Sequence, residues 1–329
     1  MNKAYLIILG GGDAQFQFIQ SGKKLGYKII IIDRNPHAVG VPLSDIYIKA
    51  STHNVNFIIK KLKNLNVNIV GLIARTNGKP LFTAAKLNES FNLIGINYEL
   101  AKISTSKSEL RKFLNKIDVP CPEGQNINSM DKELAKHLHQ KYNKVVTKPE
   151  ITIVGKKDIY LCRSVNEIKA RAYKSILSSY NKKAEVQRFI DGKDTCFLVL
   201  FYKGKFKTLL SWDEVNSFNG PLKKLVGKYI SMPARKLSKK SKKLVFQCCN
   251  KFAKHFSKSS FLLAFSFRFD KKGNGYLIEV HGDLTGDSIL DELAPKSTNT
   301  NFFDKIINFH VKKYFSTTYK MKNTIIKHP

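Results

Sequence analysis

The first hundred residues alternate between continuous apolar runs and segments with helical spacing. Residues 4–9 and 27–32 are apolar runs of the length of a strand. Between them, Phe16, Ile19 and Leu25 recur at intervals that place them on one face of a helix. The order strand, helix, strand predicts a βαβ unit, in which both strands lie parallel in one sheet.

This alternation continues to residue 95, so the N-terminal third predicts an α/β domain with a parallel sheet. We expect a helix over 55–65, a strand over 68–74, a helix over 80–87 and a short last strand over 93–95. Arg75 directly follows one of these strands. Ligands bind beyond the carboxyl ends of strands in open α/β sheets, so we predict that Arg75 meets an anionic substrate. The alternative is a solvated loop arginine.

Three consecutive glycines, Gly10, Gly11 and Gly12, follow the first predicted strand, and Asp33 ends the second. A glycine loop with an acidic residue about 20 positions later is typical of a dinucleotide site. No glycine stands where the G-x-G-x-x-G pattern requires its third one. The loop is therefore weak evidence for a dinucleotide.

Beyond residue 96 the pattern changes to short strands and hairpins separated by helices. Pro120 and Pro122 end the first of these helices, because proline lacks the amide hydrogen that a helix needs. Near the end, Phe265, Phe267 and Phe269 alternate with polar residues and lead into a turn, KKGNG, as in a β-hairpin. The expected helices are 97–114, 166–178, 238–256 and 302–315. The expected strands are 144–149, 185–190, 196–202, 206–212, 265–269 and 276–283.

The return strand of the last hairpin ends in polar residues. Glu279, His281 and Asp283 are two residues apart, so a strand places all three on one face. Two carboxylates and an imidazole on one face could hold a divalent cation and the phosphates that it bridges. The alternative is a polar strand end that faces water.

Length and composition fit a globular protein. At 329 residues the chain is long enough for two or three domains, and 43% of it is hydrophobic. No apolar run reaches the roughly 18 residues of a membrane helix. The N-terminal apolar run continues into glycines without a small-residue cleavage site, so we interpret it as a strand and not a signal peptide. Five cysteines without CxxC spacing indicate a reducing cytoplasm and no zinc site.

The formal net charge of +32 raises the question of an anionic partner. The lysines are spread along the chain and mixed with Asn and Ile, which is typical of compositional bias. Their densest cluster, over 236–243, opens a predicted amphipathic helix and is most simply its solvated face. Nucleic-acid binding is therefore kept only as the third of three hypotheses.

The last predicted hairpin contains LIEV followed by GDLTGD. This strand–turn–strand resembles the last metal-binding element of the ATP-grasp superfamily, whose members include biotin carboxylase and the carbamoyl-phosphate synthetase large chain. STSKSELRKFLNKIDVPCP, KVVTKP and EVQRFIDGKD resemble earlier elements in the expected order, and the opening LGGGDAQ resembles the domain that precedes them. The resemblance extends over about residues 4–312.

This resemblance implies an α/β protein with a Rossmann-like pre-ATP-grasp domain followed by an ATP-grasp fold of two α+β subdomains. We expect the first domain over 1–105, a small or lid subdomain over 106–184 and the C-terminal subdomain over 185–315. Residues 316–329 would be a frayed basic tail.

The resemblance also implies a nucleotide site. By it, Lys107 reaches an ATP phosphate, and Lys148 contacts the α- and β-phosphates. Gly155 is what remains of a glycine-rich flap over the phosphates, and Lys156 supplies charge there. Gln187 replaces the first glutamate of the hinge strand, whose next residues line the adenine, and Asp194 takes the place of the acid that holds the ribose. The implied ATP-binding residues are Lys107, Lys148, Gly155, Lys156, Gln187, Arg188, Phe189, Ile190 and Asp194.

At the metal site the chain departs from the family pattern. Glu279 matches the glutamate that bridges the metals, and His281 takes the place of an asparagine. Imidazole suits Mn²⁺ better than Mg²⁺. Asp283 takes the place of an arginine that helps hold transferred phosphate or substrate. Ser266 stands near the position of the first metal carboxylate, and Asp270 or Asp287 is the candidate to replace it.

What the resemblance implies about function is a carboxylate–amine ligase that uses ATP and Mg²⁺ or Mn²⁺. ATP would phosphorylate a small carboxylate, and an amine or another nucleophile would attack the acyl phosphate, with release of ADP and phosphate. The second hypothesis is a nucleotide-binding, catalytically weak homologue with a regulatory or scaffold role. No catalytic side chain is assigned, no membrane partner is expected, and a homodimer is common in the family.

Overall fold

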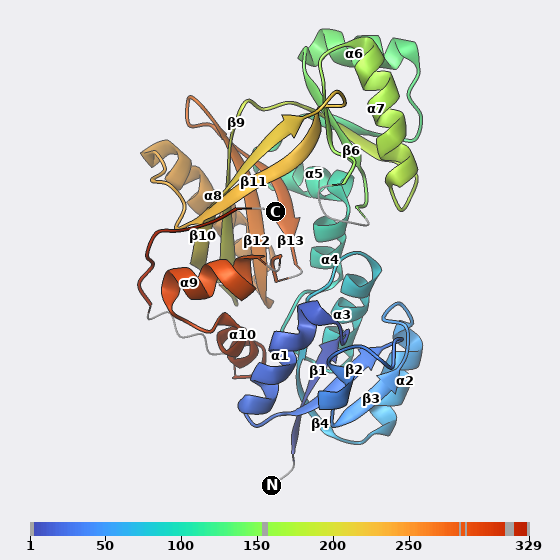
Figure 1. Ribbon diagram of the computed structural model, residues 1–329, viewed down its shortest axis with the longest axis vertical. Helices are drawn as coiled ribbons and strands as arrows, with labels where there is room; N and C mark the ends of the chain where they lie inside the picture. The colour runs from blue at the N-terminus through green and yellow to red at the C-terminus, as the bar shows by residue number, and fades with distance from the viewer. Residues whose placement is uncertain (1–2, 153–156, 283, 287, 313–318, 328–329) are drawn as a thin grey trace.

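The computed structural model describes residues 3–152, 157–282, 284–286, 288–312 and 319–327. Figure 1 shows an N-terminal domain (blue), a lobe that contains α6 (Lys132–Tyr142) and α7 (Val165–Ser178) (green), and a C-terminal part (yellow to red). Helices α4 (Tyr98–Thr105) and α5 (Lys107–Lys116) lie between the N-terminal domain and the other two parts. Among the described residues, no helix is long and apolar enough to cross a membrane.

The N-terminal domain contains a parallel four-stranded sheet in the order β3-β2-β1-β4. Its apolar runs are buried as expected, since Leu6 to Leu9 and Ile29 to Ile32 are at most 1% exposed. The strands are β1 Ala4–Leu9, β2 Lys28–Asp33, β3 Ile46–Lys49 and β4 Asn68–Ile73, and the helices are α1 Asp13–Lys24, α2 Val55–Asn64 and α3 Lys79–Ser90. The predicted α/β class is confirmed.

The strand expected over 93–95 is absent. Leu93 N instead donates to Asn88 O, and Gly95 N donates to Ser260 O, the first residue of a strand in the second sheet. Gly95 has a φ of +151°, and an added Cβ would come within 2.3 Å of the Asn88 side chain. The segment is therefore a linking turn that only glycine fits.

The second sheet has ten strands, whose main order is β13-β12-β9-β10-β11-β7-β6-β8-β5. The pairing of Lys224 on β11 with Tyr160 on β7 joins the C-terminal strands of this sheet to the strands of the green lobe. The strands are β5 Gly124–Ile127, β6 Val145–Pro149, β7 Tyr160–Cys162, β8 Ala184–Arg188, β9 Gly192–Tyr202, β10 Lys205–Asn219, β11 Lys224–Met232, β12 Ser260–Asp270, β13 Gly275–His281 and β14 Thr324–Lys327.

The expected helix over 97–114 is two helices. Ser106 adopts an extended conformation (φ −106°, ψ 121°) and caps the second helix by accepting a hydrogen bond from Glu109 N. The remaining helices are α4 Tyr98–Thr105, α5 Lys107–Lys116, α6 Lys132–Tyr142, α7 Val165–Ser178, α8 Lys239–His255, the π-helix η2 Ser288–Leu293, α9 Ala294–Thr298 and α10 Phe302–Lys312, with the short 3₁₀ helix η1 Val41–Leu43 in the N-terminal domain.

The expectation of a frayed tail is wrong for the described part of 316–329. Thr324–Lys327 forms β14, which pairs antiparallel with β11. Lys322 N donates to Ser297 O, and Tyr319 Oη donates to Leu209 O at 2.5 Å. These contacts bind the tail to the C-terminal sheet. Their free energy offsets the conformational entropy that the tail loses when it is ordered.

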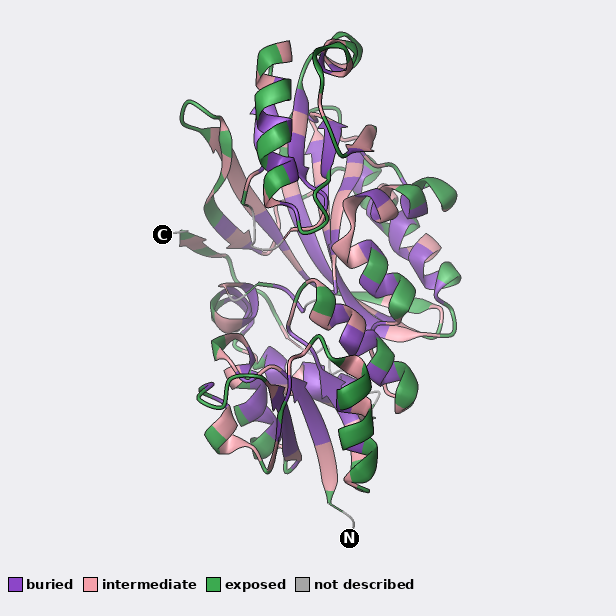
Figure 2. Ribbon diagram, turned by 90° about the vertical axis from the view of Figure 1, so that its right-hand side faces the viewer, coloured by how far each residue is buried: buried purple, intermediate pink, exposed green. Residues whose placement is uncertain are grey.

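Two faces of the large sheet are buried against helices. On one, phenylalanines of β9 and β12 pack against α8, as in the edge-to-face pair of Phe252 and Phe265 with ring centroids 4.9 Å apart. Cys248 and Cys249 of α8 are buried in the same cluster. Figure 2 shows the buried strands continuing through the centre of the molecule, with exposed helix faces outside.

Candidate nucleotide site

A cavity of about 440 Å³ brings together residues that are far apart in the sequence. It lies between the green lobe and the C-terminal sheet, since its walls come from β6 and β8 on one side and from β9 to β13 on the other. The start of α5 and the loop before α3 complete it. Of the residues implied as ATP or metal ligands, those that line this cavity are Lys107, Lys148, Gln187, Arg188, Ile190, Asp194, Glu279 and His281.

Gly155, Lys156 and Asp283 lie outside the described residues. The expectations for the flap and for the substrate contact of Asp283 therefore stay predictions. Phe189 does not line the cavity but packs edge-to-face on Phe218, with ring centroids 5.9 Å apart. Arg188 and Ile190 line the cavity on either side of Phe189 in the chain, and Phe189 supports its wall.

Lys148 is a buried cation at the centre of the site. Its side chain on β6 is 3% exposed, and its Nζ lies 3.9 Å from Glu279 Oε1 across the cavity. Burial lowers the pKa of Lys148, and the Glu279 carboxylate opposes this shift. A lysine held in this way is only partly compensated by its neighbours, which favours an anionic ligand beside it.

Lys107 is the first residue of α5, and its Nζ donates to Thr152 Oγ1 at 2.7 Å. Both residues line the cavity. The lysine therefore reaches across from the linker between domains to the segment that follows β6.

The predicted hinge residues lie on β8 and just after it. Gln187 Nε2 lies 3.3 Å from Glu185 Oε1 and donates to it, so the amide group of Gln187 is oriented by a buried carboxylate. Arg188 lies 5.5 Å from the centre of the Tyr276 ring, in cation–π geometry. Apolar side chains that also line the cavity are Val146, Ile159, Phe218, Leu225 and Ile278. They provide the kind of slot that a flat base needs.

Asp194 is bound by its neighbours in the sheet. Arg268 Nε donates to Asp194 Oδ1 at 2.7 Å and Nη2 donates to Oδ2 at 2.6 Å, which is a bidentate pair. Asn216 Nδ2 also donates to Oδ2, at 3.0 Å. A ribose hydroxyl would have to share this carboxylate with Arg268, so the ribose contact of Asp194 stays a prediction.

The described residues offer a small ligand set for a metal ion. Glu279 Oε2 lies 3.6 Å from His281 Nε2, and Ser266 is the residue paired with Glu279 across β12 and β13. No group of three His, Cys, Asp or Glu side chains that could hold a metal ion occurs in the described parts of the chain. Asp270 does not supply the missing carboxylate, because its side chain accepts hydrogen bonds from Lys272 and Asn274 in the hairpin turn. Asp287 lies outside the described residues.

Within this set, Glu279 is the carboxylate that could hold a divalent cation. Mg²⁺ in phosphate sites is commonly held by one or two carboxylates together with the phosphates of the substrate. Glu279 is such a carboxylate, and both of its oxygens are near the cavity's other charged groups. Ser266 contacts Cys196, with Oγ and Sγ 3.3 Å apart, and Cys196 Sγ lies 3.7 Å from Glu214 Oε1, so a second carboxylate lies near this position.

Sequence reasoning missed several residues of this cavity. Trp212 and Glu214 on β10 line it, and Trp212 Nε1 donates to Glu214 Oε1 at 3.3 Å. Arg268 lines it as well. The alternation of polar and apolar residues in β10 and β12 was the available signal, but it does not indicate which face of the sheet meets a ligand.

Arg75 does not line the cavity, and it is not a solvated loop residue either. It is 5% exposed, and its Nη2 pairs with Asp291 Oδ2 at 2.6 Å. Its Nη1 donates to Ala14 O at 3.0 Å and its Nε to Thr285 O at 3.4 Å. Arg75 therefore joins the N-terminal domain to the segment after β13, whose residues Thr285 to Ile289 include cavity-lining positions. Arg75 thus forms an ion pair with a partly exposed carboxylate, and its contact with an anionic substrate stays a prediction.

Replacing Arg75 with methionine should lower the free energy of unfolding by about 2 kcal/mol. The change removes a buried guanidinium and leaves the Asp291 side chain, which is 28% exposed, without this partner. Denaturant unfolding measures the loss. The control is Arg34→Met at an exposed position, and a loss at Arg75 within about 0.5 kcal/mol, as for ordinary surface substitutions, would contradict the expectation.

The glycine loop is closed by protein groups. Gly11 N donates to Asp33 Oδ2 at 2.8 Å, and Gly11 O accepts from Gly40 N at 2.8 Å. The acid that would hold a ribose in a dinucleotide site thus binds the loop itself. This arrangement agrees with the incomplete glycine pattern in the sequence.

Comparison with known proteins relates this architecture to solved structures. No protein-family model matches the sequence. The L-amino acid ligase from Bacillus licheniformis is 16% identical with a TM-score of 0.77, over 99% of this chain and 79% of that one. The biotin carboxylase domain of the 2-oxoglutarate carboxylase from Hydrogenobacter thermophilus, in complex with MgADP and bicarbonate, is 17% identical with a TM-score of 0.75, over 99% and 74%.

A third similar structure is N5-carboxyaminoimidazole synthetase from Staphylococcus aureus complexed with ADP. It is 14% identical with a TM-score of 0.74, over 99% of this chain and 83% of that one. The first of the three is named a ligase and the third a synthetase, and the second and third are complexes with ADP. The similarity extends over nearly the whole chain and includes both sheets. The chain therefore has the ATP-grasp fold, with a Rossmann-like domain at its N-terminus.

Proposed function

We propose that this protein is an ATP-dependent ligase that joins a small carboxylate to an amine, or to another nucleophile, through an acyl phosphate. The observation that carries the proposal is the convergence of Lys107, Lys148 and Glu279 on one cavity. Lys107 and Glu279 are 172 positions apart in the sequence, so their meeting is a property of the fold. The similar structures include proteins named as ligases and complexes with ADP, which supports the proposed ATP-dependent ligase.

The proposed reaction has two steps. A carboxylate oxygen of the first substrate attacks the γ-phosphorus of ATP, and the bond to the β,γ-bridging oxygen breaks to release ADP. The amine of the second substrate then attacks the acyl carbon, loses a proton, and displaces inorganic phosphate. Lys107 and Lys148 hold the phosphate oxygens in line and neutralise the charge that develops on them.

The proposed cofactor is a divalent cation. Glu279 would hold it together with the phosphates of ATP, and His281 beside it would make Mn²⁺ as acceptable as Mg²⁺. Its contribution would be to neutralise phosphate charge during the transfer. The apolar slot between Val146 and Leu225 would take the adenine, next to Gln187 and Arg188.

A second function is favoured by two observations at the site. Ser266 stands where the family has a metal carboxylate, and Asp194 is occupied by Arg268. Both changes reduce the groups that are free to act on a bound nucleotide. A nucleotide-binding protein with little turnover, in a regulatory or scaffold role, is therefore the alternative to the ligase.

One experiment separates these two functions. ATP affinity is measured by calorimetry with Mg²⁺ or Mn²⁺, and ADP release is then assayed over a panel of small carboxylates, each with and without a panel of amines. Carboxylate-dependent ADP release supports the ligase. Tight ATP binding without release for any pair supports the second function, and no binding of ATP overturns both.

A further inference from the structure

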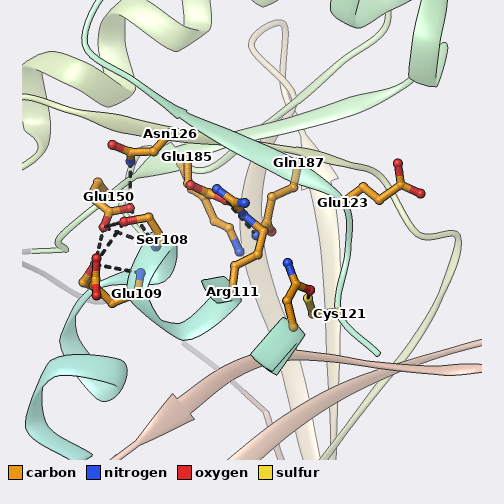
Figure 3. A network of polar contacts seen from close by, with 12 residues as sticks. Ser108, Glu109, Arg111, Cys121, Glu123, Asn126, Glu150, Glu185 and Gln187 are labelled. Atoms are coloured by element: carbon orange, nitrogen blue, oxygen red, sulfur yellow. Dashed lines mark hydrogen bonds and ion pairs between the residues drawn. The ribbon is translucent and has the colours of Figure 1, made fainter. Parts of the chain in front are cut away.

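Glu150 is a buried carboxylate two residues after Lys148, and it lies outside the cavity lining. It is 1% exposed. Ser108 Oγ donates to Glu150 Oε1 at 2.7 Å, and Ser106 Oγ donates to the same oxygen. Ser108 N lies 3.2 Å from both carboxylate oxygens, and Asn126 Nδ2 donates to Oε2 at 3.0 Å. Figure 3 shows Glu150 beside Ser108 at the start of α5, with Asn126 on the opposite side.

These contacts surround the residue whose side chain reaches the cavity. Lys107 stands between Ser106 and Ser108, so the two serines that bind Glu150 are its chain neighbours on either side. Lys107 N also lies 3.4 Å from Glu150 O and donates to it. The carboxylate and the backbone of Glu150 therefore determine where the chain of Lys107 lies relative to β6, the strand that carries Lys148.

Helix capping alone does not account for this carboxylate. Ser106 Oγ already accepts a hydrogen bond from Glu109 N, which is the usual cap of a helix such as α5. A buried carboxylate is costly even when it accepts several hydrogen bonds. A serine-capped helix with an apolar neighbour would have avoided that cost. The buried carboxylate of Glu150 is better explained by the fixed spacing that it imposes between the start of α5, which carries Lys107, and β6, which carries Lys148.

Helix α5 has a second buried carboxylate as partner, farther along its length. Arg111 Nε donates to Glu185 Oε1 at 2.7 Å, and Glu185 is paired with Lys148 across β6 and β8. Arg111, Glu185 and Gln187 appear next to the Glu150 contacts in Figure 3. Because Glu185 fixes the body of α5 independently, the contacts of Glu150 act on the first turn, where Lys107 lies.

We propose that Glu150 is a positioning residue that holds Lys107 at the distance from Lys148 at which both reach one polyphosphate. This inference rests on the proposed binding of ATP in the cavity. Glu150 would not touch the nucleotide, and its effect would pass through the Lys107 ammonium. Loss of Glu150 should therefore lower the affinity for nucleotides in proportion to the number of phosphates that Lys107 contacts. It should not weaken the binding of the base and sugar.

The test compares the affinities of the full chain for ATP and AMP by calorimetry. Glu150→Gln keeps the shape of the side chain but places an amide donor against Ser108 N and Asn126. We expect the affinity for ATP to fall about tenfold and that for AMP by less than about twofold. In a Lys107→Ala background the same change should have no further effect on ATP, because the group that Glu150 positions is gone.

Two further variants make the result decisive. Glu109→Gln is the matched control, since Glu109 is another acid of the same helix turn and pairs with Lys102 and Lys112 near the surface. It should leave the ratio of the two affinities unchanged. If Glu150→Gln does not fold, Ser108→Ala removes one donor to Glu150 and should still lower the affinity for ATP more than that for AMP.

Two results would overturn the inference while leaving the proposed function intact. One is an equal loss of ATP and AMP binding in Glu150→Gln, and the other is the same loss of ATP binding with and without Lys107. Wild-type protein that binds no ATP would instead refute the proposed function, and the inference with it.

Discussion

Replacing Lys148 with methionine should weaken ATP binding by about a hundredfold while changing the stability of the unliganded protein little. The Lys148 ammonium is the most buried cation of the cavity wall, at 3% exposure, and the carboxylate oxygen of Glu279 is 3.9 Å away. Its removal leaves a polyphosphate without a desolvated partner. Methionine has a similar length and no charge, so packing is kept.

The stability half of this expectation follows from the cost of burying a charge. Burial lowers the pKa of Lys148, which means that the folded protein disfavours its protonated form. Removing the charge relieves that cost and also removes the attraction to Glu279, so the free energy of unfolding should stay within about 1 kcal/mol of wild type. A residue kept for folding would instead lower the stability when it is replaced.

Calorimetric titration with ATP measures the affinity, and denaturant unfolding measures the stability of the unliganded protein. Lys86→Met is the control, because Lys86 is an exposed lysine whose ion pair is with Glu89, three residues later on the helix surface. It should change neither quantity. Unchanged ATP affinity in Lys148→Met would remove the main support for a nucleotide in this cavity.

Acid should destabilise the wild-type protein by about 3 kcal/mol more than a His310→Phe variant between pH 7 and pH 4. His310 is buried on α10, and burial lowers its pKa from 6.5 to about 4. Its Nδ1 lies 2.9 Å from Ile306 O, and the residues around it are mostly apolar, such as Leu72 and Leu262.

The sign of this effect follows from where each state takes up a proton. Below pH 6.5 the unfolded chain protonates its histidine, whereas the folded chain does not do so until about pH 4. Protons therefore favour unfolding through this window, and below it the difference stays constant. The contribution of neutral His310 to the free energy of unfolding is fully present above pH 6.5, and it is lost as the pH falls towards 4.

The measurement is the free energy of unfolding at several pH values for both proteins. Comparing slopes with pH removes any constant effect of phenylalanine on packing. A variant at the exposed His53 is the control and should keep the wild-type pH dependence. Identical slopes for wild type and His310→Phe would show that this histidine is not the group that responds to acid.

The sequence alone determined the class of the fold and many of its elements, although not strands such as β3 and β5. The apolar runs of the first sheet and the helical spacing in segments such as 238–256 are local periodicities, and they are found again in α8 and in β1, β2 and β4. Lys107, Lys148 and Glu279 were chosen from short motifs, and the fold brings them to one cavity. A local pattern is enough to predict an element where the periodicity of that segment decides its secondary structure. The order of the short motifs along the chain was enough to predict the three site residues.

Only the tertiary structure decided which polar groups are partners. Arg75 meets Asp291, which is 216 positions away, and Arg268 takes both oxygens of Asp194 across a strand pair. Glu150 binds the serines on either side of Lys107, and the tail adds a strand to β11. Such pairings depend on strand register and on the approach of elements far apart in the chain, for which a single sequence carries no periodic signal. Charged side chains look alike in sequence whether water or a buried partner surrounds them, and packing decides between the two.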